Sequence, residues 1–261
     1  MEPTARFVEL ISGPEAALEL DEAWYLVSAH ARDDLTLDAV RAGLDELAGR
    51  VEESTLDGVV ALLFEREGFG GNTADYYDPD NSFVDQVLAR RRGIPLSLSM
   101  LTIEVARRVG VNLDGVGMPG HFLVRTRNEP PVFVDPFGGG ARLSVDGCAA
   151  LFRAGQGPEA PFDVALLDPV GPRAMLARLL ANLRAIYQQR GDRRSLVWVL
   201  RLRSRIPGVP LADWRALASA LASVGRFDEA AAELDQLAAH VAEGPGERLR
   251  ARATELRARL N

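Results

Sequence analysis

Residues 81–137 decide the fold of this chain, and they read NSFVDQVLARRRGIPLSLSMLTIEVARRVGVNLDGVGMPGHFLVRTRNEPPVFVDPF. Apolar residues recur at helical spacing on both sides of Gly93-Ile94-Pro95, so the glycine ends one predicted helix and the proline begins another. Gly110 ends the second helix, and the two arginines shortly before it suit the negative end of the helix dipole. The stretch therefore predicts two consecutive helices, the second with a strongly apolar face.

Two β-rich runs follow these helices, His121–Arg125 and Val132–Asp135. The polar turn between them predicts an antiparallel hairpin. His121 opens the first run and Asp135 closes the second, so we expect their side chains to meet on neighbouring strands. A carboxylate beside an imidazole fixes its tautomer, as in a catalytic triad, although a purely structural pair would have the same sequence. The third member would come from the helix start after Pro95, where the helix dipole favours a nucleophile or an oxyanion.

Three motifs occur in a fixed order: RRGIPLSLS at residues 91–99, PGHFLVR at 119–125 and DPFGGG at 135–140. This series resembles the SirB1-type branch of the transglutaminase-like superfamily, and the resemblance covers roughly residues 50–200. It implies an α+β fold, a papain-like core in which helices pack on a small antiparallel sheet. It also implies that His121 and Asp135 stand where the family has its catalytic histidine and aspartate.

The family's nucleophile is a cysteine about one turn into the helix after Pro95, and this chain departs from the pattern there. It has LSLS at residues 96–99, and its single cysteine, Cys148, lies after the second strand. Ser97 is the nearest substitute, but a serine hydroxyl is a much poorer nucleophile than a thiolate and needs a well-aligned base. Ser97 and Ser99 are also suited to cap the first turn. Cys148, next to two alanines, is typical of a small buried apolar side chain.

Two functions of different class fit these residues. One is a non-catalytic binding or regulatory module, and the other is an acyl-transfer enzyme or hydrolase that uses Ser97, His121 and Asp135. We favour the first because the nucleophilic cysteine is missing. We expect no cofactor and no metal. The glycines at 138–140 predict a tight turn, since they lack the Lys-Ser/Thr of a phosphate-binding loop.

Composition is that of an ordinary globular protein. The chain has 261 residues, 47% of them hydrophobic and 26% charged, enough for one large core or two modest ones. A single cysteine excludes a disulfide scaffold and fits a reducing compartment. The start, MEPTARFVEL, lacks the features of a signal peptide, and no apolar run is long enough to span a bilayer. We therefore predict a cytoplasmic protein without a membrane partner.

Charge is distributed unevenly along the chain. Residues 1–85 hold 20 acidic residues and 5 arginines, a net charge of −15, and the remainder holds 17 acids and 25 arginines, a net charge of +8. Nine arginines and one acid fall within Pro172–Ile206, which can indicate a nucleic-acid surface. Helices with arginine on their outer faces have the same composition. We predict no nucleic-acid partner and expect acidic and basic segments to face each other or a charged partner.

The residues before the deciding stretch are predicted to be helical. Apolar periodicity indicates helices over Pro14–Ala31, Leu35–Val51 and Asp57–Phe64, the last of which leads into a glycine-rich loop. We expect these helices to pack against the hairpin sheet. Together with the core they make up the first predicted domain, residues 1–170.

Residues 171–261 form the second predicted domain, which contains an internal repeat. Six pairs of residues match at an offset of 34, the period of a tetratricopeptide (TPR) unit. Repeats of this kind bury each other's apolar faces and bind peptides or proteins. We therefore predict a TPR-like α-helical region and a protein or peptide partner, with an unrelated pair of helical hairpins as the alternative. The matched pairs are Leu180 with Trp214, Leu183 with Leu217, Tyr187 with Leu221, Gly191 with Gly225, Leu196 with Ala230, and Leu200 with Leu234.

Overall fold

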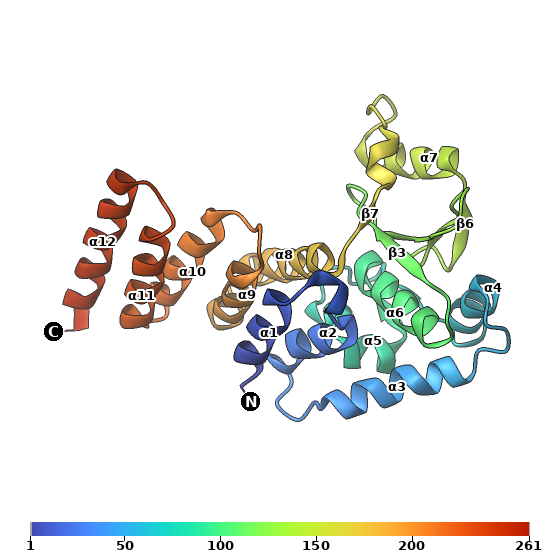
Figure 1. Ribbon diagram of the computed structural model, residues 1–261, viewed down its shortest axis with the longest axis horizontal. Helices are drawn as coiled ribbons and strands as arrows, with labels where there is room; N and C mark the ends of the chain where they lie inside the picture. The colour runs from blue at the N-terminus through green and yellow to red at the C-terminus, as the bar shows by residue number, and fades with distance from the viewer. Residues whose placement is uncertain (1, 261) are drawn as a thin grey trace. The chain divides into compact units, whose positions relative to one another are not determined.

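Figure 1 presents the computed structural model, which describes residues 2–260. The chain forms two compact units. One comprises Pro14–Leu179, and the other combines the residues up to Gly13 with those from Leu180 onward. The division falls within helix α8 (Pro172–Arg190), whereas the predicted domain boundary lies just before this helix. No helix in the described part of the chain is long and apolar enough to cross a lipid bilayer.

A five-stranded antiparallel sheet of order β6-β5-β4-β3-β7 belongs to the first unit (Figure 1). The predicted hairpin forms its middle, and Val124 of β4 pairs with Val134 of β5. The other three strands do not stand out as β-rich runs, because they contain aspartate, glycine or proline or are largely exposed, and the sequence does not predict them. The five strands are β3 (Leu113–Val116), β4 (Leu123–Thr126), β5 (Phe133–Asp135), β6 (Ala141–Leu143) and β7 (Pro169–Val170).

Helix α6 (Pro95–Arg108) is the centre of the first unit. Every residue from Pro95 to Ala106 is buried. The helix contacts strands β3 and β4 and also helices α2, α3 and α5, so it is covered on several sides. The prediction of a helix that begins at Pro95 and ends before Gly110 is confirmed. The covering helices are α2 (Leu20–Ala29), α3 (Leu37–Gly49) and α5 (Val84–Arg90).

The N-terminal helices differ from the predicted ones mainly at their ends. The predicted helix over Pro14–Ala31 is interrupted, because Leu18 and Glu19 are extended and separate a short 3-10 turn from α2. Helix α3 follows its prediction to within two residues at each end. Helix α4 (Leu56–Val60) continues as a π-helix over Ala61–Arg66, which a 3.6-residue periodicity does not reveal.

Helix α7 (Val145–Gln156) packs on the sheet face opposite the one turned to α6 (Figure 1). Leu123 and Phe133 from the central strands form an apolar cluster with Cys148 and Phe152 of α7. Asp135 follows Phe133 by two positions, and in a strand such residues share a face. The predicted aspartate therefore belongs to the α7 side of the sheet.

Two buried carboxylates, Asp21 of α2 and Glu104 of α6, are neutralised by arginines near the end of α6. Asp21 and Glu104 are exposed by 2% and 1%. Arg108 donates from Nη2 to Asp21 Oδ2 at 2.7 Å and also contacts Glu104, and Arg107 donates to Glu104 at 2.8 Å. Burial alone would raise the pKa of Asp21, but the hydrogen bond and charge of Arg108, helped by Arg41, hold it below its ordinary value.

The second unit is helical and builds its own core. Its helices α9 to α12 pack each on the next along the chain, and α1 (Pro3–Ser12) packs on α9. Arginines of the basic stretch face carboxylates of the following helices: Arg203 with Asp213 at 2.9 Å and Arg201 with Glu229 at 2.6 Å. The four helices are α9 (Arg193–Arg205), α10 (Leu211–Ser223), α11 (Phe227–Ala238) and α12 (Glu243–Arg257).

Asp21→Asn should destabilise the protein by about 3 kcal/mol at neutral pH, because it breaks a buried ion pair and leaves Arg108 undercompensated. The folded-state pKa of Asp21 lies below the ordinary value of 3.8, so its stabilisation is present above pH 3.8 and is lost as the pH falls through the folded pKa. In urea unfolding, the difference between wild type and Asp21→Asn should therefore be largest at neutral pH and shrink in acid. Asp33→Asn removes an exposed carboxylate and is the control. A difference that does not change with pH would contradict the prediction.

Candidate functional site

The loop between β3 and β4 carries His121 and is held by side chains from two helices. Nη2 of Arg178, in α8, donates to the carbonyl oxygens of Met118 (2.8 Å) and His121 (2.9 Å). Oγ of Ser99, in α6, donates to the carbonyl oxygen of Phe122 at 3.2 Å. The backbone around the imidazole is therefore fixed from outside the loop.

The imidazole of His121 forms no hydrogen bond or ion pair with any residue in the described part of the chain. Its Nδ1 is fully buried and has no hydrogen-bond partner. Nε2 also lacks a partner in this part of the chain, but it is not fully buried, so this nitrogen reaches solvent. A buried Nδ1 without an acceptor favours the neutral tautomer that carries its proton on Nε2.

Asp135 is occupied by the turn that follows β5. Its Oδ1 accepts the backbone N–H of Phe137 at 3.0 Å, and its carbonyl oxygen accepts the N–H of Gly140 at 2.9 Å. The register that pairs Val124 with Val134 places residue 123 opposite Asp135, and His121 precedes the start of β4. Among residues 2–260, no hydrogen bond or ion pair joins Asp135 to His121. The expected contact is therefore not formed as a hydrogen bond.

Ser97 is completely buried in the first turn of α6. Its hydroxyl donates to the carbonyl oxygen of Asn81 at 2.6 Å and accepts the backbone N–H of Ile94 at 3.0 Å. This is the capping role that the sequence also allowed. A Cβ added at Gly93 would lie 2.6 Å from Ser97 Oγ, so the chain closes tightly over the hydroxyl. The structure brings Ser97 into hydrogen-bond contact with neither His121 nor Asp135 among the described residues.

Cys148 is buried in α7, which confirms its interpretation as a small buried apolar side chain. Burial, together with the negative charge of Asp135, raises the pKa of the thiol to about 11. Both effects oppose ionisation, and the thiolate is the nucleophilic form. Cys148 therefore does not replace the missing family nucleophile.

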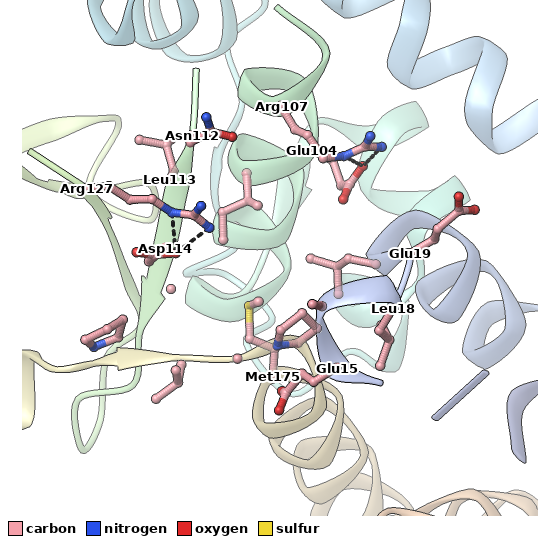
Figure 2. Close-up of a pocket in the computed structure, with 18 of the residues that line it drawn as sticks. Glu15, Leu18, Glu19, Glu104, Arg107, Asn112, Leu113, Asp114, Arg127 and Met175 are labelled. Atoms are coloured by element: carbon pink, nitrogen blue, oxygen red, sulfur yellow. Dashed lines mark hydrogen bonds and ion pairs between the residues drawn. The ribbon is translucent and has the colours of Figure 1, made fainter. Parts of the chain in front are cut away.

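A cavity of about 720 Å³ lies in the first unit, lined by parts of α6, β3 and the start of α8 (Figure 2). Ser97, His121 and Asp135 are not among its lining residues. Its size is that of a small-molecule site. However, its charged side chains already form ion pairs, for example Asp114 with Arg127 and Glu104 with Arg107 (Figure 2). The cavity therefore offers no uncommitted charged group for chemistry.

Local sequence patterns do not single out the residues that hold the His121 loop. Arg178 is one of nine arginines in a basic stretch, and nothing in its neighbours distinguishes it. The sequence predicts for Ser99 a role in capping the first turn, whereas its hydroxyl reaches residue 122. Both contacts span long distances in sequence, so only the tertiary fold reveals them.

Ser97→Ala should lower the free energy of unfolding by about 1–3 kcal/mol, because it leaves the buried carbonyl of Asn81 and the N–H of Ile94 without their partner. Ser54 is exposed, so Ser54→Ala is the matched control and should change little. Both are measured by urea unfolding at neutral pH. Unchanged stability in Ser97→Ala would mean that the hydroxyl does not have this structural role.

Cys148 should react slowly with a thiol reagent such as dithionitrobenzoate in the folded protein. At pH 8, a pKa of about 11 keeps the thiolate fraction on the order of a hundred-fold below that of an ordinary thiol. The same residue should react at the normal rate in 6 M guanidinium, which serves as the internal control, since the chain has one cysteine. Rapid labelling of the folded protein would contradict the buried, protonated thiol.

Comparisons with known proteins agree on the first unit. A sequence profile of the transglutaminase-like superfamily matches residues 19–181, more than half of the chain. A UPF0162 protein of Xylella fastidiosa is 43% identical over 157 residues, 57% of this chain and 56% of that protein. A UPF0162 protein of Pseudomonas aeruginosa is 33% identical over 166 residues, 63% of this chain and 60% of its own length.

A similar stretch occurs in a larger protein of mouse. F-box only protein 21 of Mus musculus is 35% identical over 162 residues, which are 58% of this chain but 25% of the mouse protein. The matches span little more than half of the bacterial relatives. No solved structure matches the chain. From the profile match, the chain belongs to the transglutaminase-like superfamily.

Proposed function

We propose that this chain is a SirB1-type member of the superfamily that binds a protein or peptide partner and does not catalyse acyl transfer. The proposal is supported above all by the burial and the hydrogen bonds of the Ser97 side chain. Its hydroxyl is fully buried and already hydrogen-bonded to the backbone of Asn81 and Ile94. A nucleophile has to reach a substrate carbonyl and transfer its proton to a base, and the Ser97 hydroxyl donates to a backbone carbonyl instead. Because Cys148 is buried and the pKa of its thiol is raised to about 11, neither Ser97 nor Cys148 supplies an activated nucleophile.

The binding role is assigned to the helices of the second unit, which we propose to be TPR-like. Corresponding positions at the 34-residue offset have similar environments, which supports a repeat: Leu183 and Leu217 are both fully buried. Gly191 and Gly225 both have positive φ, at 68° and 80°, and both follow the end of a helix. Glycine is the usual residue at such C-terminal positions. Stacked helix pairs present extended surfaces for peptides.

The match to the mouse protein is compatible with a binding module. There the similar stretch makes up a quarter of a longer chain, so a domain of this kind is combined with other segments. We place the protein in the cytoplasm, because its one cysteine is a free thiol. Neither nucleic acid nor a membrane is proposed as a partner.

A hydrolase or acyl-transfer enzyme that uses Ser97, His121 and Asp135 is the second candidate. It is favoured by one observation: the imidazole of His121 has no hydrogen bond to any residue within 2–260, while its loop is held by Arg178 and Ser99. A histidine with no structural partner on a fixed loop is free to exchange a proton with a ligand.

Activity-based labelling separates the two candidates. We expect the purified protein to remain unlabelled by a fluorophosphonate probe between pH 6 and 9, and to transfer no amine to a glutamine-containing peptide. A serine hydrolase labelled in parallel controls the reagent. Labelling at Ser97 that disappears in His121→Ala would overturn the proposal and establish the enzyme.

A further inference from the structure

We propose that Arg178, with His121 and Tyr76, forms a binding site for a carboxylate or phosphate group of a ligand. The site lies at the loop between β3 and β4, within the first unit. This inference is independent of the proposed function, because the site would bind its ligand whether or not His121 takes part in a reaction.

Arg178 differs from the comparable arginines in lacking a counterion. Among residues 2–260, every other partly buried arginine has a carboxylate oxygen within 4.0 Å, and Arg178 has none. A buried cation without a partner is costly, because it loses hydration that nothing replaces. In agreement, burial lowers the pKa of Arg178. An anionic ligand would supply the missing charge.

The guanidinium of Arg178 has donors left for such a ligand. Both protons of Nη2 are used by the carbonyl oxygens of Met118 and His121. Nε–H and the two protons of Nη1 have no acceptor in the described part of the chain. These two nitrogens are not fully buried, so they remain accessible. The group also lies over the ring of Phe122, with 5.4 Å between Cζ and the centroid. Its plane is thus held in place, as bidentate recognition of carboxylate or phosphate requires.

The imidazole of His121 belongs to the loop residue whose carbonyl oxygen Arg178 binds, so both side chains act at the same short loop. Its Nδ1 is buried and unpaired, and the neutral tautomer that this favours directs an N–H at Nε2 toward solvent. Arg178 and His121 therefore offer hydrogen-bond donors at this loop. Neither side chain forms an ion pair with a carboxylate among residues 2–260. An oxyanion is the ligand group that accepts from such donors.

The exposed ring of Tyr76 lies near the cation and contacts a second exposed ring, that of Tyr77. Tyr76 and Tyr77 are 39% and 59% exposed, and their ring centroids are 5.3 Å apart. The Tyr76 ring also packs edge-on against Phe137, at 6.1 Å. Arg178 interacts electrostatically with Tyr76, which places the phenol close to the guanidinium. Exposed aromatic rings beside a cation suit a ligand whose anionic group is attached to a flat or apolar portion.

Histidine NMR tests the proposal directly, because the chain has three histidines, His30, His121 and His240. The full chain is titrated with inorganic phosphate, phenyl phosphate, acetate and benzoate at constant ionic strength in sodium chloride. We expect saturable changes in the ring-proton chemical shifts of His121, since an anion bound beside the imidazole changes its electrostatic environment, and no change at His30 or His240. The more tightly bound pair of probes identifies phosphate or carboxylate as the group recognised.

Arg178→Gln should weaken binding of the preferred aromatic probe at least tenfold. Arg92→Gln is the matched control, because Arg92 also donates to two backbone carbonyls, those of Gly68 and Arg91, but is exposed.

Tyr76→Ala leaves the contacts of Arg178 with the loop intact. It should weaken binding of the aromatic probes and leave binding of inorganic phosphate or acetate unchanged. This variant keeps the test valid if Arg178→Gln unfolds. No selective change at His121 with any probe, or equal binding by Arg178→Gln, would overturn the proposal.

Discussion

The ion pairs between α2 and α6 hold these two helices of the first unit together in its interior. Asp21 and Glu104 are carboxylates in the interior, and Arg108 contacts both of them. Charges in such a position are tolerated only when their partners are held in place. The pairs therefore fix how α2 packs on α6, and α6 in turn is the helix on which β3, β4, α3 and α5 pack. The position of the His121 loop depends on this arrangement, because Ser99 of α6 holds residue 122.

The parts of the fold that follow from local sequence are those marked by periodicity and by glycine or proline. Helix α6 begins at Pro95 as its sequence indicates, and β4 and β5 lie within two residues of the predicted hairpin. The interruption at Leu18 and Glu19 and the π-turn after α4 are not visible in an apolar pattern, because both are departures from regular helix. The other three strands are not marked in this way, because β3 contains Asp114 and Gly115, β7 begins with a proline and β6 is largely exposed.

The candidate site could be predicted only in part, since its chemistry depends on contacts between distant residues. The sequence identifies His121, Asp135 and Ser97 through a family pattern, but it cannot say what their polar atoms bind. Ser97 donates to residue 81, and Asp135 accepts from a backbone N–H two residues later. The role of Arg178 depends on a loop 57 residues away. Local hydrogen bonds in turns and hydrogen bonds between distant residues thus decide which polar side-chain atoms remain available to a ligand.

The enclosure of Ser97 limits how this scaffold could change during evolution. A thiol introduced at position 97 would enter a space closed by the backbone of Gly93 and directed at the carbonyl of Asn81. It would be buried away from solvent, so a cysteine substitution alone would not create an accessible nucleophile. An accessible thiol at this position would require the helix start and the segment around Asn81 to change together. The tight packing around residue 97 therefore couples any change of chemistry there to changes in two other segments of the chain.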